Sequence, residues 1–202
     1  MTPNRFDGVA QDWDKNLIHT QRTEAIKKAL LPILQQGKYQ TALEFGAGTG
    51  LLSFALKDEF QSITMMDNSQ EMVKVSNEKI AVSGITNIFP LYFDLEHQNY
   101  DGKTFDCIFT QMAMHHVENI NIVVQKFSEM LQTNGLLAIA DLYLEDGTFH
   151  DDSFTGHKGF DPEEFKTKLA KVGFVNINYS ECFVIQRENG NYPIFLMKAE
   201  KS

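Results

Sequence analysis

The sequence has few cysteines, no long apolar run and no excess of basic residues. Its 202 residues include only Cys107 and Cys182, each within a short apolar stretch. These two could form a disulfide, but two buried thiols in a reducing compartment are the interpretation that we favour. No apolar run approaches the roughly 20 residues that a membrane-spanning helix needs, and residues 1–14 do not resemble a secretory signal. We therefore expect a cytoplasmic protein without a membrane span.

Acidic residues outnumber basic ones, with 27 Asp and Glu against 18 Lys and Arg, and the net charge is −9. Proteins that bind phosphate backbones usually carry an excess of Lys and Arg. We therefore expect no nucleic acid or anionic membrane as a partner, although a local basic patch can exist in an acidic chain. With 43% apolar and 22% charged residues, the composition fits one globular domain spanning residues 1–202. The oligomeric state is not indicated.

Short apolar runs alternate with helix-like stretches along most of the chain. Such alternation predicts a mostly parallel sheet with helices on both faces. The expected strands are 41–47, 62–67, 88–94, 105–110 and 135–143, and the expected helices are 22–34, 51–59, 70–83 and 120–132.

The pattern changes near the C-terminus. Asp161-Pro162 is typical of a helix start, and the helix should end before Gly173. Two strands, 175–185 and 192–200, then flank Asn189-Gly190, which indicates a hairpin turn. We therefore expect an antiparallel pair at one edge of the sheet and seven strands in all.

A glycine-rich turn, Glu44-Phe45-Gly46-Ala47-Gly48-Thr49-Gly50, follows the first strand. Glycines let the backbone approach a ligand closely, and the next helix presents free N–H groups at its first turn. Dinucleotide-binding folds use G-x-G-x-x-G, whose third glycine would fall at Leu51. The G-x-G-x-G spacing found here therefore speaks against a nicotinamide-dependent oxidoreductase.

This turn resembles motif I of the class I S-adenosylmethionine (SAM)-dependent methyltransferases. Three further segments resemble later motifs of that family in the same order, and the resemblance covers about residues 40–145. It implies a Rossmann-like three-layer sandwich whose seven-stranded, mostly parallel sheet has a reversed last strand. The later segments are 67–72, Asp94-Leu95, and the fourth strand 105–109 with Gln111 after it.

The resemblance implies SAM as cofactor and S-adenosylhomocysteine as product. In the family, the acidic residue before the glycines lies near the amino group of SAM. The acidic residue that ends the second strand accepts the ribose hydroxyls, and motif III meets the adenine. Plain structural roles remain open: Asp67 as a helix cap, Asp94 as a solvated strand end, Met72 as core. The expected cofactor residues are Glu44, Gly46, Gly48, Gly50, Asp67, Asn68, Met72, Asp94, Leu95, Gln111 and Trp13.

The N-terminal residues resemble the branch that includes the ubiquinone and menaquinone methyltransferases. Phe6-Asp7 and Trp13-Asp14 match its aromatic lead, which folds over SAM as a lid, and an aromatic face can attract a sulfonium. Residues 1–36 would then form the lid and a helix, and residues 40–202 the core. The alternative is that Trp13 only packs the N-terminal helix on the core.

Candidate catalytic residues follow the fourth and fifth strands. His115-His116 resembles a segment that borders the cleft in the same branch, and an imidazole can accept a proton near neutrality. Asp141 ends the fifth strand on the same side. Capping or structural hydrogen bonding is the alternative for all three. The long loop 144–160 would be a lid or a substrate loop. Its residues His150, Asp151, Asp152 and His157 lack the compact spacing of metal ligands, so we expect no metal.

The acceptor is expected to be a small molecule. Enzymes that methylate nucleobase amines carry Asn/Asp-Pro-Pro-aromatic after the fourth strand, where this chain has residues 110–113, Thr-Gln-Met-Ala. The sequence therefore predicts in-line methyl transfer from SAM to a small-molecule acceptor. A non-catalytic SAM-binding or regulatory protein on the same fold is the alternative. The sequence does not identify the acceptor or the accepting atom.

Overall fold

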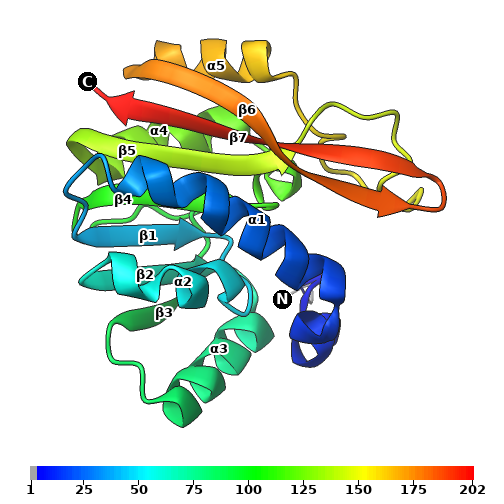
Figure 1. Cartoon of the computed structure of the whole chain (residues 1–202), viewed down its shortest axis with the longest axis horizontal. Helices are drawn as coiled ribbons and strands as arrows, with labels where there is room; N and C mark the ends of the chain where they lie inside the picture. Colours follow the sequence, from blue (N-terminus) through cyan, green and yellow to red (C-terminus); the bar gives the residue numbers. More distant parts are fainter. Residues whose placement is uncertain (1–3) are drawn as a thin grey trace.

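Seven strands form one sheet in the order β3-β2-β1-β4-β5-β7-β6 in the computed structural model, which describes residues 4–202 (Figure 1). The strands are β1 (Thr41–Phe45), β2 (Ser62–Asp67), β3 (Ile88–Tyr92), β4 (Phe105–Gln111), β5 (Leu131–Leu142), β6 (Phe174–Arg187) and β7 (Gly190–Lys201). The α-helices are α1 (Leu17–Leu34), α2 (Leu51–Ala55), α3 (Gln70–Ser83), α4 (Ile120–Met130) and α5 (Pro162–Lys171). Three short 3-10 helices are η1 (Asp7–Lys15), η2 (Lys57–Glu59) and η3 (Met114–His116).

The strand pairing confirms the predicted fold class. β1 pairs in parallel with both β2 and β4, and β2–β3 and β4–β5 are also parallel. The last strand, β7, runs antiparallel to both of its neighbours. The chain therefore winds outward from β1 to β3, crosses back to β4, and winds outward on the other side.

Helices cover both faces of the sheet. Because side chains alternate between faces along each strand, neighbouring residues of β1 enter two different hydrophobic cores. On one face, Leu43 of β1 packs in a core with α4 and α5, whose central residues are Phe127 and Phe165. On the other face, Ala42 packs in a second core with α1 and α2, including Ile26 and Leu52. Figure 1 shows α1 crossing one face and α4 and α5 lying on the other.

Three elements differ from their expected bounds by more than two residues. α1 begins at Leu17 rather than at residue 22, because the Asn16 side chain accepts a hydrogen bond from the Ile18 N–H and caps the helix there. α2 ends at Ala55 and continues as the 3-10 turn η2. β5 begins four residues before Gly135, where its register against β4 shifts between the pairs at Phe105 and Cys107.

Both cysteines are free thiols, as the sequence analysis favoured. Cys107 is buried inside β4 and Cys182 is half-buried in β6. Among residues 4–202, none of the helices has the length and apolar character needed to cross a lipid bilayer.

The packing of α4 on the sheet predicts a large effect at Phe127, whose side chain is fully buried. We expect Phe127→Ala to lower the free energy of unfolding by about 3–5 kcal/mol, because the cavity left behind adds to the lost burial. Urea denaturation followed by circular dichroism measures this change. Ile122→Ala on the same helix is the control, because Ile122 is 42% exposed and should change stability little. Equal effects of the two substitutions would contradict the assigned face of α4.

Candidate active site

A cavity of about 390 Å³ lies at the carboxyl ends of the parallel strands, and η1 forms part of its wall through Val9 and Trp13. The fold explains this place, because the strand order reverses between β1 and β4 and leaves a crevice there. Nine of the eleven expected cofactor residues line the cavity, while Glu44 and Gly50 do not: those lining it are Trp13, Gly46, Gly48, Asp67, Asn68, Met72, Asp94, Leu95 and Gln111.

The glycine turn needs its glycines for two reasons. Gly46, Gly48 and Gly50 all have positive φ, at 63°, 56° and 84°, in the left-handed region that other residues rarely adopt. A Cβ atom on Gly46 would also lie 2.3 Å from the Cβ of Ala113. Gly50 serves the fold, because it precedes α2 and packs against Met65 away from the cavity.

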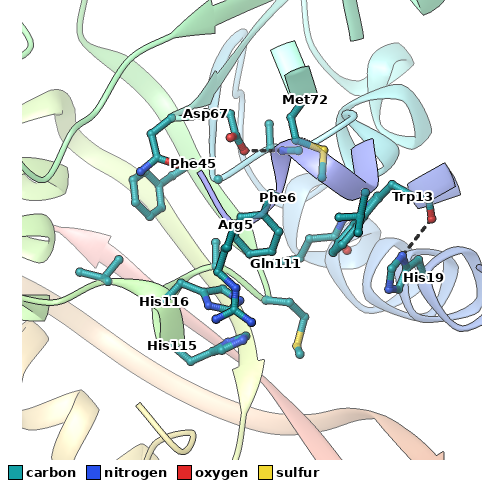
Figure 2. Close-up of a pocket in the computed structure, with 18 of the residues that line it drawn as sticks. Arg5, Phe6, Trp13, His19, Phe45, Asp67, Met72, Gln111, His115 and His116 are labelled. Carbon is teal, nitrogen blue, oxygen red and sulfur yellow. Dashed lines mark hydrogen bonds between the residues drawn. The ribbon is translucent and has the colours of Figure 1, made fainter. Parts of the chain in front are cut away.

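Asp67 holds the glycine turn to the end of β2. One carboxylate oxygen accepts a hydrogen bond from the Gly48 N–H at 2.7 Å (Figure 2). The other accepts one from the Ser69 N–H at 2.8 Å. Ser69, rather than Asp67, caps α3, because its hydroxyl accepts from the Met72 N–H. The helix-cap alternative therefore does not account for Asp67. Burial raises the pKa of this carboxyl above its ordinary value.

Glu44 lies behind the turn rather than in the cavity. Its neighbour Phe45 lines the cavity, whereas Glu44 points toward α2, where one carboxylate oxygen accepts a hydrogen bond from the Ser53 N–H at 3.0 Å. The other oxygen, Oε1, is buried without a partner. Burial raises the pKa of Glu44 to about 8. The structure thus shows no direct exposure of Glu44 to the cofactor cleft.

The loops after β2 and β3 supply the next part of the wall. Met72 is 2% exposed and packs with Ala10 of η1, and it also lines the cavity, so core packing and a ligand contact are compatible. The Asp94 carboxylate forms its contacts within its own loop. It accepts a hydrogen bond from the Glu96 N–H and lies 3.0 Å from His97 Nδ1. Leu95 lies beside it in the cavity wall.

The N-terminal segment is tied down across the cavity mouth. The Asn4 amide donates to the Asn68 backbone carbonyl at 3.0 Å, and Asp7 accepts a hydrogen bond from the Ser69 hydroxyl at 2.7 Å. At the other end of η1, Asp14 forms an ion pair of 2.6 Å with Lys79. These contacts reach the loop after β2 and helix α3, so the segment is held closed by polar contacts at both of its ends.

Trp13 borders the cavity next to the glycine turn. Its ring meets Phe6 edge to face at a centroid distance of 5.9 Å and lies over His19 at 4.2 Å. The His19 ring also bonds the Trp13 carbonyl through Nδ1 at 3.0 Å (Figure 2). Trp13 therefore packs η1 on α1 and faces the cavity at the same time.

His115 and Asp141 form a buried pair on the far side of the cavity. Asp141 is fully buried, and its Oδ1 lies 2.6 Å from His115 Nδ1. The same carboxylate accepts the backbone N–H groups of His115 and Leu142. Asp141 itself does not line the cavity, whereas His115 does. The carboxylate thus fixes the imidazole, which presents its other nitrogen, Nε2.

His116 lies beside His115, with ring centroids 4.1 Å apart, and meets Phe6 of the N-terminal segment edge to face (Figure 2). Burial, aided by His115 and Arg5, lowers the pKa of His116 to about 2. The imidazole is therefore neutral at pH 7, but it is a weak proton acceptor.

The loop 144–160 reaches the cavity through Phe149 and His150. It is anchored to η3, because the His157 N–H donates to the His115 carbonyl at 2.8 Å. His150 lines this cavity, whereas the loop residues Asp151, Asp152 and His157 do not. Burial lowers the pKa of His150 to about 4. Nothing in the sequence spacing pairs this residue with His115 and His116.

Three arginines, Arg5, Arg22 and Arg187, also line the cavity and were not expected there. Arg22 is only 6% exposed, and its Nε is buried without a partner. Burial lowers the pKa of Arg22 to about 10, although the negative charge of Asp141 acts to raise it. Sequence periodicity could have identified Arg22, because it lies four residues before Ile26 on the buried face of α1.

Comparison with known proteins gives one consistent family. Residues 43–139 match the model of a methyltransferase domain. An uncharacterised methyltransferase of Schizosaccharomyces pombe is 30% identical over 176 residues, covering 79% of this chain and 60% of the yeast protein. A Staphylococcus carnosus relative, also an uncharacterised methyltransferase, is matched over 51% of its length. The chain thus spans between half and two thirds of these two curated relatives.

Solved structures share the fold at low sequence identity. A Haloferax volcanii protein described as a methyltransferase, solved with the Trm112 activator, superposes with a TM-score of 0.78 over 99% of both chains at 15% identity. A Haemonchus contortus phosphoethanolamine N-methyltransferase, solved in complex with phosphomonomethylethanolamine and S-adenosylhomocysteine, superposes with a TM-score of 0.71 over 87% of this chain and 52% of that one, at 16% identity.

The raised pKa of Glu44 predicts a pH-dependent stability. Because its folded pKa of about 8 exceeds the ordinary 4.5, the folded chain binds an extra proton between these values. Stability therefore falls as pH rises through this window, by at most about 1.4 kcal/mol per pH unit. We expect Glu44→Gln to flatten the fall between pH 5 and 8 in urea denaturation. The exposed Glu59→Gln is the control, and parallel curves for Glu44→Gln and the unsubstituted protein would refute the assignment.

Proposed function

Because the chain belongs to the class I SAM-dependent methyltransferases, we propose that it transfers a methyl group from SAM to a small-molecule acceptor in the cavity under η1. The observation that carries the proposal is convergence. The glycine turn, Asp67 and the Asp94-Leu95 segment come from three different strands and line one cavity. A family resemblance in sequence alone would not require their side chains to meet.

The residues present fit SAM. Gly48 has no side chain in front of the cavity, so the backbone is open to a ligand there. Asp67 uses one lone pair on each oxygen for backbone N–H groups, which leaves acceptor capacity for ribose hydroxyls. The partnerless Oε1 of Glu44 would be satisfied by a water or ammonium group behind the turn. When bound, SAM supplies the electrophilic methyl group.

The protein's part in the chemistry is to align and to exclude water. Methyl transfer is an in-line displacement, and holding both reactants in position can contribute roughly 7–11 kcal/mol. The cavity volume falls within the range of small-molecule pockets, and the lid closes one side of it. We propose that the adenosine lies against Asp67 and Met72, and that the acceptor lies on the side of His115.

The charge of the cavity favours an anionic group on the acceptor side. The guanidinium of Arg22 is nearly buried and its Nε has no hydrogen-bond partner. A buried charge is costly unless it is paired. A carboxylate or similar anion would pair with it, contributed by the methionine part of the cofactor or by the acceptor.

We place the loss of the acceptor's proton at the pair of His115 and Asp141. The carboxylate holds His115 in one tautomer, with a proton on Nδ1. His116, whose pKa burial lowers to about 2, is better suited to shaping the wall than to accepting a proton. An acceptor with an ionisable oxygen or sulfur would therefore bind next to His115.

Loss of the Asp67 carboxylate should weaken cofactor binding. We expect Asp67→Ala to cost about 1–3 kcal/mol, or about 5- to 150-fold in the Kd for SAM, because charge-assisted hydrogen bonds are lost. Isothermal titration calorimetry measures this, with the exposed Asp58→Ala as control and with NAD injected in parallel. Unchanged SAM affinity would remove the ribose assignment, and tight binding of NAD would remove the proposed cofactor.

Loss of the Asp141 carboxylate should affect turnover rather than cofactor affinity. We expect Asp141→Asn to lower kcat by about 100-fold, because His115 loses its orienting partner. The measurement is release of S-adenosylhomocysteine in a screen of small acceptors that carry ionisable hydroxyl or thiol groups, with the pH profile of the active ones. A Kd for SAM that stays constant separates this role from misfolding. If the unsubstituted protein binds SAM but turns over no acceptor, the non-catalytic alternative is favoured.

A further inference from the structure

Three histidines from two separate segments meet at the acceptor side of the cavity. His115 and His116 come from η3, and His150 comes from the loop 144–160. Each can present one ring nitrogen so that all three nitrogens lie within 4.8 Å of one another. Within residues 4–202, no other group of three or more His, Cys, Asp or Glu residues is arranged in this way.

Two of these imidazoles have polar atoms that the protein does not satisfy. The Nδ1 atoms of His116 and His150 are buried and have no hydrogen-bond partner. Buried polar atoms are nearly always paired. Only five side-chain atoms in the described part of the chain are unpaired in this way, so two in one cluster point to a ligand that binds there.

The third imidazole is oriented as a metal-binding histidine usually is. Asp141 bonds Nδ1 of His115 at 2.6 Å, which leaves Nε2 for a ligand. Carboxylate–histidine–metal arrangements of this kind fix the tautomer of the ligand and raise its basicity. His150 is held as well, because its ring stacks on Phe154 at a centroid distance of 3.7 Å.

We propose that His115, His116 and His150 bind one divalent metal ion, preferentially Zn²⁺, beside the methyl-transfer site. Three neutral imidazoles with an open fourth position form a known kind of catalytic zinc site. Tetrahedral ligation at about 2.1 Å places ligand nitrogens about 3.4 Å apart. The three nitrogens, which lie within 4.8 Å of one another, would therefore move closer by up to about 1.4 Å when an ion binds. This departs from the expectation of no metal.

The surrounding charges define what would occupy the fourth position. Asp141 offsets part of the ion's charge, whereas Arg5 and Arg187 add positive charge at the cavity. Both arginines are exposed, and Arg187 donates a hydrogen bond to the Phe149 carbonyl. A dication among neutral imidazoles and guanidinium groups favours an anionic fourth ligand. The acceptor would therefore bind through an oxygen or sulfur atom that ionises on the metal.

The role of the ion in catalysis rests on the proposed function. The acceptor's O–H or S–H group binds the ion and releases its proton to solvent. Its electron pair then attacks the methyl carbon of SAM, and the carbon–sulfur bond breaks with both electrons going to sulfur. Neutral methylated acceptor and S-adenosylhomocysteine result. With the ion in place, ionisation no longer requires His115 to accept the proton, because a bound cation lowers the acceptor's pKa.

Metal binding can be tested without knowing the acceptor. Tag-free protein is stripped with chelator and titrated with Co²⁺, followed by visible absorption, and then with Zn²⁺ in competition. We expect one ion per chain with the spectrum of four-coordinate Co²⁺. We expect His150→Gln to weaken binding by at least 100-fold and Asp141→Asn by about 10- to 100-fold. His157→Gln, on the same loop but outside the cluster, should bind as the unsubstituted protein does.

A second measurement covers the case in which a variant fails to fold. Anomalous scattering from crystals of the unsubstituted protein soaked in Co²⁺ should place the ion between the three imidazoles. Absence of stoichiometric binding, an ion elsewhere, or equal affinity in a folded His150→Gln variant would overturn the metal proposal. SAM affinity is measured on the same stripped samples. If the unsubstituted protein binds SAM but no metal ion, only the metal proposal fails. If the unsubstituted protein does not bind SAM, the proposed methyl transfer fails instead.

Discussion

The parallel pairing of β1 with both β2 and β4 determines where the site residues at the strand ends lie. The connections after β1 lead to one side of the sheet, and those after β4 lead to the other side. A crevice therefore remains between the carboxyl ends of β1 and β4. Gly46 follows β1, Asp67 ends β2 and Gln111 ends β4, and all three residues line this crevice. The hydrophobic cores on the two sheet faces keep this register fixed, since a slip of one residue would exchange Leu43 and Ala42 between faces.

The segment over this crevice is held by apolar and polar contacts together. Ala10 of η1 packs with Met72 and Val75, Trp13 packs against the same cluster, and Asp14 forms an ion pair with Lys79. Both partners of that pair are partly exposed, with side chains 35% and 27% accessible. Exposed ion pairs contribute little to stability, so this pair adds only a small part of the free energy that holds η1 in place.

The sequence predicted what depends on local pattern and missed what depends on tertiary contacts. The glycine turn and Asp67 were predictable because a strand end and a motif place them without reference to distant residues. Glu44 is expected near the amino group of SAM, and alternation along β1 directs its side chain toward α2, behind the glycine turn. His150 was not predictable as a neighbour of His115, because a loop without periodicity carries no signal for its path. Arg22 lay between these cases, since its position on a buried helix face was visible but its exposure to the cavity was not.

The two ends of the cavity differ in charge, and this difference bears on the proposed reaction. Carboxylates face the proposed adenosine end, at Asp67 and Asp94, whereas Arg22 and the histidines face the other. Groups at the second end are not satisfied by the protein: Arg22 Nε and His116 Nδ1 are buried without partners. Such groups destabilise the folded chain until a ligand pairs with them. Binding of an anion or a metal ion removes this destabilisation, because the buried atoms then have partners. Ligand binding at this end is therefore stronger than at a site whose polar atoms are already hydrogen-bonded.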